Sequence, residues 1–257
     1  MDSSVFLVRK SPAYLGGAAG FLLKDEMLRS FEDLPVAVRT GGTVLPGEGT
    51  VSYDNPVWVE FAHGMANMMF PAAQEIARRV IPSTGGSPTN VLDIAAGHGI
   101  YGISVAQHHA EARVTACDWA PVLAVAEQNA MRFGVADRFR KLVGDAMKVD
   151  FGGPYDMVLV PNFFHHFDKE TNIRLMRKIR ESLAPGGRVI TVEFVPNEDR
   201  ISPASTAPFA LVMLASTRNG DACTLSEYRQ MFVAAGYSST NPVALEMSPE
   251  TVLVSRV

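Results

Sequence analysis

The segment Gly97-His98-Gly99-Ile100-Tyr101-Gly102 has the spacing G-x-G-x-x-G and lies between an expected strand and an expected helix. Glycines let a backbone approach a ligand closely, and the first turn of a helix presents N–H groups without intrahelical partners. The pattern is found in NAD, FAD and S-adenosylmethionine sites alike. Alone, it therefore predicts a nucleoside-binding turn but no particular cofactor.

Three aspartates lie at the carboxyl ends of three consecutive expected strands: Asp93, Asp118 and Asp145. Ligands bind at that edge of an open α/β sheet, so three carboxylates there indicate a ligand site. Asp118 can accept hydrogen bonds from a ribose diol, and Asp145 can accept one from an adenine amino group. Asp93 would repel a pyrophosphate but attract a sulfonium compound that carries an ammonium group. Together they favour S-adenosylmethionine over a nicotinamide dinucleotide.

A second group that could do chemistry is the pair His165-His166, in the segment that follows the fourth expected strand. An imidazole beside an acceptor hydroxyl can act as a general base, which typically accelerates a reaction about 10²–10⁴-fold. Neighbouring histidines point in different directions, so at most one should face the acceptor. Neither this pair nor His108-His109 has the i, i+4 spacing that presents two metal ligands on one helix face, and no metal is expected.

The elements that must position these residues alternate from about Val91 onward. Runs rich in β-branched residues lie at 90–95, 113–118, 139–145, 155–161 and 188–195, and helical patterns lie at 100–109, 121–134 and 169–187. A capping box predicts a further helix from Thr224, and the last twenty residues are typical of two strands that turn near Ser248. The alternation predicts a parallel sheet wrapped by helices.

The first ninety residues differ from the rest of the chain. A short helical pattern at 24–34 is followed by an expected linker at 34–43, and a longer helix is expected from about Pro56 to Val80. The chain has 257 residues, of which 47% are hydrophobic, and a formal charge of −4. It contains no Lys/Arg-rich run and no apolar run of membrane length, so neither nucleic acid nor a membrane is an expected partner. Cys117 and Cys223 are expected as reduced thiols of a cytoplasmic protein.

In order and spacing, LDIAAGHG, TACDW, GDA, YDMVLVPNFFHHF and LAPGGRVITVEF resemble the motifs of class I S-adenosylmethionine-dependent methyltransferases. The resemblance is greatest to small-molecule O-methyltransferases of the plant caffeate type and the bacterial polyketide-tailoring type. It implies an α/β, Rossmann-like fold with a seven-stranded sheet whose last strand is antiparallel. It also implies that residues 1–50 are the remnant of an N-terminal dimerisation domain and linker, that 51–257 form the cofactor-binding domain, and that a homodimer is an expected assembly.

The same resemblance implies a set of S-adenosylmethionine contacts, with S-adenosylhomocysteine as the product. The expected cofactor residues are Asp93, Gly97, Gly99, Asp118, Trp119, Gly144, Asp145, Ala146, Met147 and Asn162. It places the general base at His165 and an acidic partner at Glu193. The second acid of the family falls on Ala222, so its neighbour Asp221 is the candidate for that role.

An apolar acceptor pocket is expected from aromatic and methionine side chains: Trp58, Phe61, Met65, Phe163, Phe209 and Met213. By resemblance, Phe61 and Met65 are the first candidates for substrate contact. The predicted function is methyl transfer to a hydroxyl of an aromatic or polyketide-like small molecule. Two alternatives stay open: non-methylating chemistry (hydroxylation, decarboxylation or a pericyclic step) in the same cofactor-binding fold, and an NAD-dependent dehydrogenase.

Overall fold

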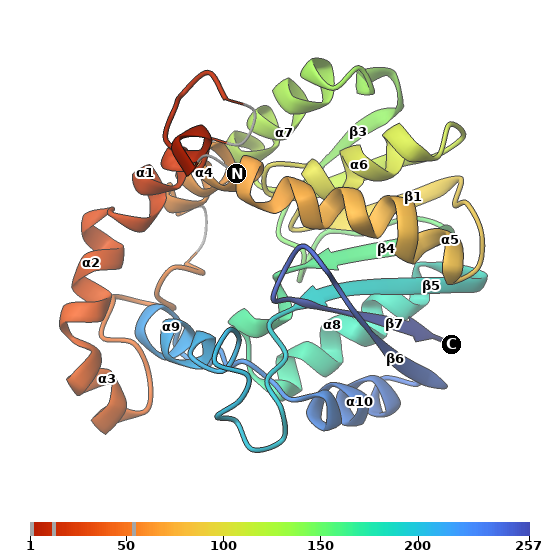
Figure 1. The fold of residues 1–257 in the computed structure, drawn as a ribbon. Coiled ribbons are helices and arrows are strands. Elements are labelled where there is room, and N and C mark those ends of the chain that lie inside the picture. The colour runs from red at the N-terminus through yellow and green to blue at the C-terminus, as the bar shows by residue number, and fades with distance from the viewer. Residues whose placement is uncertain (1–2, 12–13, 53–54) are drawn as a thin grey trace.

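A seven-stranded sheet crosses the part of the chain that the computed structural model describes, residues 3–11, 14–52 and 55–257 (Figure 1). Its strand order is β3-β2-β1-β4-β5-β7-β6; β7 pairs antiparallel with both β5 and β6, and the other neighbouring pairs are parallel. The strands are β1 (Asn90–Ile94), β2 (Arg113–Asp118), β3 (Phe139–Val143), β4 (Tyr155–Pro161), β5 (Leu183–Glu193), β6 (Ser239–Ala244) and β7 (Thr251–Arg256). The predicted α/β fold with an antiparallel last strand is confirmed.

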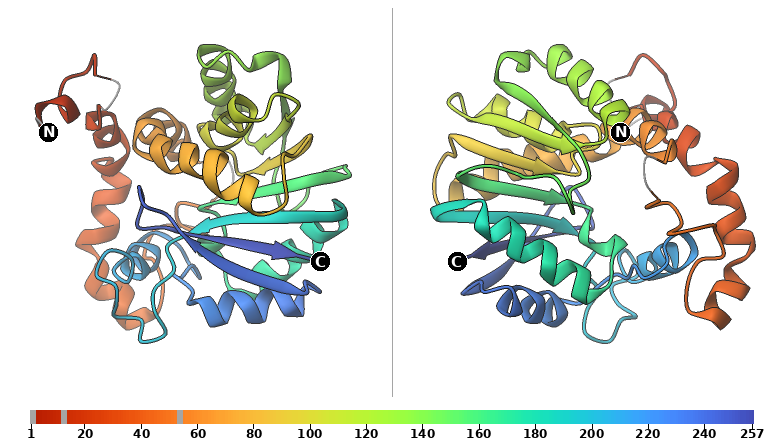
Figure 2. Two further views of the ribbon diagram at one scale, coloured as in Figure 1. Left: turned by 45° about the vertical axis from the view of Figure 1, so that its right-hand side comes forward. Right: turned by 180° about the vertical axis from the view of Figure 1, so that it is seen from behind.

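Helices cover both faces of the sheet, with α4, α6 and α7 on one face and α8 and α10 on the other (Figure 2). The helices are α1 (Ala19–Leu22), α2 (Asp25–Glu32), α3 (Leu34–Thr40), α4 (Val57–Glu75), α5 (Ile81–Ser83), α6 (Ile100–His108), α7 (Ala120–Arg132), α8 (Lys169–Glu181), α9 (Phe209–Ser216) and α10 (Leu225–Ala234). Among the described residues, no helix has the length and apolar character needed to cross a bilayer.

Each face of the sheet packs against its own layer of apolar side chains, so the central strands are buried on both faces. In β4, Met157 and Leu159 pack in the layer that contains Ile103, whereas Val158 and Val160 pack in the layer that contains Phe232. A strand buried on both faces reads as a continuous apolar run, which is typical of parallel sheets. The polar residues that follow such runs therefore meet at one edge of the sheet.

Three expected boundaries are wrong. The linker expected at 34–43 contains helix α3, because Pro35 is favourable in a first helical turn and Gly41 ends the helix with φ +80°. The helix expected over 169–187 ends at Glu181, since Leu183 already pairs with Tyr155 in the sheet. The long helix expected to Val80 leaves α-helical geometry at Ile76, where a π-helical turn begins.

The N-terminal helices lie along α4 and α9: α1 contacts α4, and α2 and α3 contact α9 (Figure 1). A Cβ atom on Gly64 of α4 would lie 2.7 Å from the carbonyl oxygen of Gly17, so this approach requires glycine. Thr43 and Thr50 donate to the carbonyl oxygens of Ala215 and Ser216 (2.5 and 3.1 Å) at the end of α9. The N-terminal segment thereby holds α4 and α9 beside the same edge of the sheet.

Candidate functional site

The loop between β1 and α6 has the left-handed backbone that its glycines permit. Gly97 and Gly99 have φ of +57° and +74°. A Cβ atom on Gly102 would lie 2.7 Å from Cγ1 of Val114 and 2.8 Å from Oδ2 of Asp93. The third glycine therefore lets α6 pack against the sheet, while the first two shape the turn above it.

Asp93 lies under this loop and is fully buried. Its Oδ2 accepts a hydrogen bond from the Gly102 N–H (3.0 Å), while Oδ1 has no hydrogen-bond partner among the described residues. Burial raises the pKa of Asp93 to about 8, and the nearby charge of Asp118 acts in the same direction. One oxygen thus holds the start of α6, and the other is left for a donor that the described residues do not supply.

Asp118 connects the glycine loop to the end of β2. Its carboxylate accepts from the N–H groups of Gly97 (2.9 Å) and Trp119 (2.7 Å). Burial raises its pKa to about 6, and these two hydrogen bonds oppose that rise. The side chain is only partly covered, and a carboxylate can accept about four hydrogen bonds. It can therefore accept further donors from a ligand.

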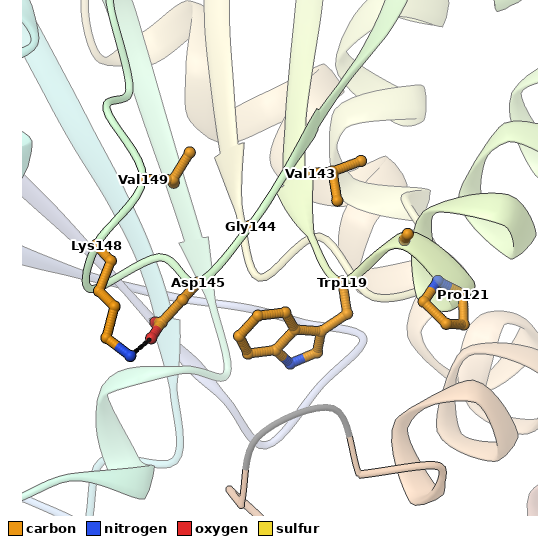
Figure 3. A pocket seen from close by; sticks show the side chains of 8 residues that line it. Trp119, Pro121, Val143, Gly144, Asp145, Lys148 and Val149 are labelled. Atoms are coloured by element: carbon orange, nitrogen blue, oxygen red, sulfur yellow. Dashed lines mark ion pairs between the residues drawn. The ribbon is translucent and has the colours of Figure 1, made fainter.

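A pocket of about 420 Å³ opens between the ends of β2 and β3, where Trp119 follows Asp118 in the chain (Figure 3). It is lined by Trp119, Gly144 and Asp145, three of the predicted cofactor residues, together with Pro121, Val143, Lys148 and Val149. Asp145 accepts from the Met147 N–H (2.9 Å) and forms an ion pair with Lys148 (3.2 Å). Ala146 is buried, and its carbonyl accepts from Lys178 (2.8 Å).

Asn162 lies at the end of β4 with φ of +54°. Its Nδ2 donates to Oε1 of Glu250 (2.6 Å), and its Oδ1 is buried without a partner among the described residues. The buried hydroxyl of Tyr101 lies beside the Asn162 side chain. Oδ1 of Asp93 and Oδ1 of Asn162 are thus two buried acceptors without a hydrogen-bond partner among the described residues, which fits a ligand whose ammonium group donates hydrogen bonds.

His165 and Glu193 form a buried pair behind this edge. Nδ1 of His165 lies 2.5 Å from Oε2 of Glu193, and Oε1 of Glu193 accepts from the N–H groups of Phe163 and Phe164 (3.1 and 2.8 Å). Burial lowers the pKa of His165 and raises that of Glu193. Since Nδ1 faces the carboxyl group, Nε2 is left without a hydrogen bond among the described residues, in the orientation a proton acceptor needs.

Asp221 contacts this pair through its backbone rather than through its carboxylate. Its N–H donates to the carbonyl oxygen of His165 (2.9 Å), whereas Oδ2 forms an ion pair with Arg200 (2.8 Å). Glu193 is the acid that contacts the imidazole. Arg200 also binds Glu227 of α10, so the loop after β5 is fastened to the segment beside His165.

Aromatic side chains from three elements surround the two histidines. Trp58 of α4 lies 5.2 Å from the His166 ring, and Phe209 of α9 lies 4.9 Å from the His165 ring, both edge to face. Phe163 approaches His166 at 6.4 Å. These predicted acceptor residues therefore come together around the imidazoles.

The other predicted acceptor residues differ in their position. Phe61 packs on Trp58 and stacks on His98 of the glycine loop (5.8 Å), so it connects the aromatic side chains around the histidines with this loop. Met65 and Met213 are buried in the helices that carry Phe61 and Phe209.

Sequence reasoning missed Glu250, Tyr101 and Arg200. Tyr101 lies within the G-x-G-x-x-G segment, but the motif assigns a role only to the glycines. Glu250 could have been found as a charged residue directly before an expected apolar strand. Arg200 lies in an irregular loop and carried no signal. Among the described residues, no three His, Cys, Asp or Glu side chains gather as a metal site would require.

Comparisons with known proteins show which family and which solved structures the chain is similar to. Residues 49–238 match the family profile described as the O-methyltransferase domain. A solved structure of a candidate O-methyltransferase from Nostoc punctiforme is 48% identical, with a TM-score of 0.94 over 99% of this chain and 76% of that chain.

Two curated relatives are more distant. The S-adenosylmethionine-dependent methyltransferase PigF of a Serratia species is 29% identical over 63% of this chain and 47% of its own length. Its structure with S-adenosylhomocysteine has a TM-score of 0.86 at 24% identity, covering 99% of this chain and 77% of that chain. The phenazine O-methyltransferase PhzM of Lysobacter antibioticus is 26% identical over 83% of this chain and 63% of its length. The chain thus spans less than two thirds of the length of both curated relatives.

Proposed function

Because the chain belongs to the O-methyltransferase domain family, we propose that it methylates a hydroxyl group of an aromatic small molecule with S-adenosylmethionine as the donor. The observation that carries this proposal is the juxtaposition of two sites at one sheet edge. Trp119, which follows Asp118 in the chain, and Asp145 line a nucleoside-sized pocket, and His165 presents a free ring nitrogen among aromatic side chains.

The residues of the cofactor side fit a sulfonium nucleoside. Trp119 and Asp145 line a space of a size and character suited to an adenine, and Asp118 can accept from ribose hydroxyls. The unpaired oxygens of Asp93 and Asn162 suit an amino-acid end that brings N–H donors. When bound, S-adenosylmethionine supplies a methyl group already activated by a positively charged sulfur.

The acceptor side supplies the proton chemistry. A phenol of pKa about 10 is ionised about one part in a thousand at pH 7, a deficit of about 4 kcal/mol. Nε2 of His165 takes up the hydroxyl proton as the oxygen becomes the nucleophile, and Glu193 stabilises the imidazolium that forms. Burial lowers the pKa of His165, so its ring is unprotonated and able to accept at neutral pH.

The aromatic lining supports a flat acceptor. Trp58, Phe163 and Phe209 offer ring edges and faces around the histidines, and PhzM is a phenazine O-methyltransferase. Aromatic pairs of this geometry add about 0.5–1.5 kcal/mol beyond area burial. A hydroxylated aromatic or polyketide-like compound therefore suits the site better than an aliphatic alcohol.

The test is a mass-shift assay with S-adenosylmethionine and a panel of hydroxylated aromatic compounds. Methyl transfer predicts a product heavier by one methyl group and an equal amount of S-adenosylhomocysteine. A changed acceptor without S-adenosylhomocysteine would instead favour non-methylating chemistry in the same site. The dehydrogenase alternative loses its basis, because the glycine motif belongs to a domain that matches O-methyltransferases.

A further inference from the structure

Glu250 is a buried carboxylate that the proposed transfer step does not use. It directly precedes β7, and 6% of its surface is exposed. Its Oε1 accepts from Nδ2 of Asn162 (2.6 Å), and its Oε2 accepts from Oγ of Ser248 (2.7 Å). Burial raises the pKa of Glu250, and the Asn162 amide turns its NH₂ group toward the accepting Oε1 of this carboxyl group.

Fixing one end of the amide fixes the other. Oδ1 of Asn162 points away from Glu250, is buried and has no partner among the described residues. An unpaired buried acceptor is unfavourable, so a donor is expected there when the site is complete. The backbone of Asn162 is also held, because its N–H donates to the carbonyl oxygen of Val192 (2.8 Å).

The surroundings of this oxygen favour a cationic donor. Carboxylates reach the region from β1 (Asp93), β5 (Glu193) and the start of β7 (Glu250), and the buried hydroxyl of Tyr101 lies close enough to be affected by all three charges. No Lys or Arg side chain donates to any of these three carboxylates in the described part of the chain. Burial raises the pKa of all three carboxyl groups, so a nearby cation stabilises each of them, which suits an ammonium group.

We propose that Glu250 is a positioning residue for the cofactor: it turns the Asn162 amide so that Oδ1 accepts a hydrogen bond from the ammonium group of S-adenosylmethionine. This inference rests on the proposed function, because it takes this edge of the sheet as the cofactor site. Glu250 itself does not touch the cofactor. Its effect is confined to the amino-acid end and does not extend to the nucleoside end at Asp118.

Two thioether nucleosides separate these ends. S-adenosylhomocysteine carries the amino-acid group, whereas 5′-methylthioadenosine lacks it. Their affinities are measured by calorimetry for the wild type, Asn162→Ala, Glu250→Leu, the double variant and Ser248→Ala, each first checked for a cooperative thermal transition. Ser248→Ala is the matched control, because it removes the two hydrogen bonds between Ser248 and Glu250 and leaves the Asn162 side chain intact.

We expect Asn162→Ala and Glu250→Leu each to weaken S-adenosylhomocysteine about tenfold and methylthioadenosine less than about twofold. The double variant should be no weaker than the worse single one, since both remove the same interaction. Ser248→Ala should change neither affinity by more than about twofold. If Glu250→Leu does not fold, Glu250→Gln is judged by the same criterion, with an expected loss of about threefold for S-adenosylhomocysteine alone.

Equal losses for both nucleosides, unchanged S-adenosylhomocysteine affinity in a folded Glu250 variant, or additive losses in the double variant would each overturn the inference. A wild type that binds neither nucleoside would instead contradict the proposed function. The two failures are therefore distinguishable.

Discussion

Two regions at the same sheet edge differ in how their carboxylates are held: the proposed cofactor side, with Asp118 and Asp145, and the proposed acceptor side, with His165 and Glu193. Asp118 and Asp145 are partly covered, and both accept hydrogen bonds from backbone N–H groups next to a pocket. Glu193 is fully buried and contacts the imidazole of His165. On the proposed function, Asp118 and Asp145 would contact the cofactor directly, whereas Glu193 would act through His165.

The largest effect expected from this contrast is at His165. His165→Gln removes the proton acceptor while keeping a polar side chain, so methyl transfer should fall about 10²–10⁴-fold. The affinity for S-adenosylhomocysteine should stay within about twofold of wild type. Rates are measured with an acceptor found in the mass-shift panel, and affinities by calorimetry. A rate within threefold of wild type would remove His165 from the proposed role.

Glu193→Gln tests the carboxyl group that contacts the His165 imidazole. Without its carboxylate the imidazolium loses its stabilising charge, and the amide can hold the ring in the wrong tautomer, so the rate should fall about 10²-fold or more. The affinity for S-adenosylhomocysteine is the control and should hold. A loss of affinity as large as the loss of rate would mean that Glu193 supports the whole edge and not the base.

Asp118→Ala tests the cofactor side. The variant loses the acceptor for ribose hydroxyls and leaves the N–H groups of Gly97 and Trp119 unpaired, so S-adenosylhomocysteine should bind about tenfold to hundredfold more weakly. Asp118→Asn keeps one acceptor oxygen and should lose less. Calorimetry on both variants decides, and unchanged affinity in Asp118→Ala would contradict the assignment.

Asp221→Asn should reduce the rate less than His165→Gln or Glu193→Gln does. Its ion pair with Arg200 is 41% exposed on both side chains, and exposed pairs contribute about 0–1 kcal/mol. Its backbone N–H to His165 is unaffected by the substitution, so the rate should fall less than about fivefold. A loss as large as that of Glu193→Gln would show that the Asp221 carboxylate, and not only Glu193, supports the base.

Asp93→Asn should change stability and not the transfer step, and its effect depends on pH. Burial raises the pKa of Asp93 in the folded state, so the stability linked to this group is present below its unfolded pKa and is lost as the pH rises toward about 8. The variant lacks this loss, and each kcal/mol moves the melting temperature about 2–4 °C. The melting temperature of Asp93→Asn relative to wild type should therefore rise between pH 5 and pH 8. A constant difference would contradict the raised pKa.

The structure brings three of the predicted cofactor residues, Trp119, Gly144 and Asp145, to one pocket, and the sequence signals that place them are local. Asp118 and Trp119 are adjacent in the chain at the end of β2, and Gly144 and Asp145 are adjacent just past the end of β3, so a correct strand prediction brings them together. The Asn162–Glu250 hydrogen bond joins residues 88 positions apart across a sheet order that the chain pattern does not specify. Such a contact follows only from tertiary structure.

For the proposed acceptor side, the sequence indicated which residue types would gather but not how each side chain would be oriented. The pairing of His165 with Glu193 was expected through family resemblance, but the turn of the Asp221 carboxylate toward Arg200 depends on how the loop after β5 folds back. Helix α3 was missed because a proline and two β-branched valines give a weak local helix signal. Its packing against α9 stabilises it instead.

The most direct test of the account is a crystal structure of the protein with S-adenosylhomocysteine. We predict the adenine between Trp119 and Asp145, the ribose on Asp118, and the sulfur directed toward the space in front of His165. A nucleoside bound anywhere else, or crystals grown at saturating ligand that show none at this edge, would contradict it.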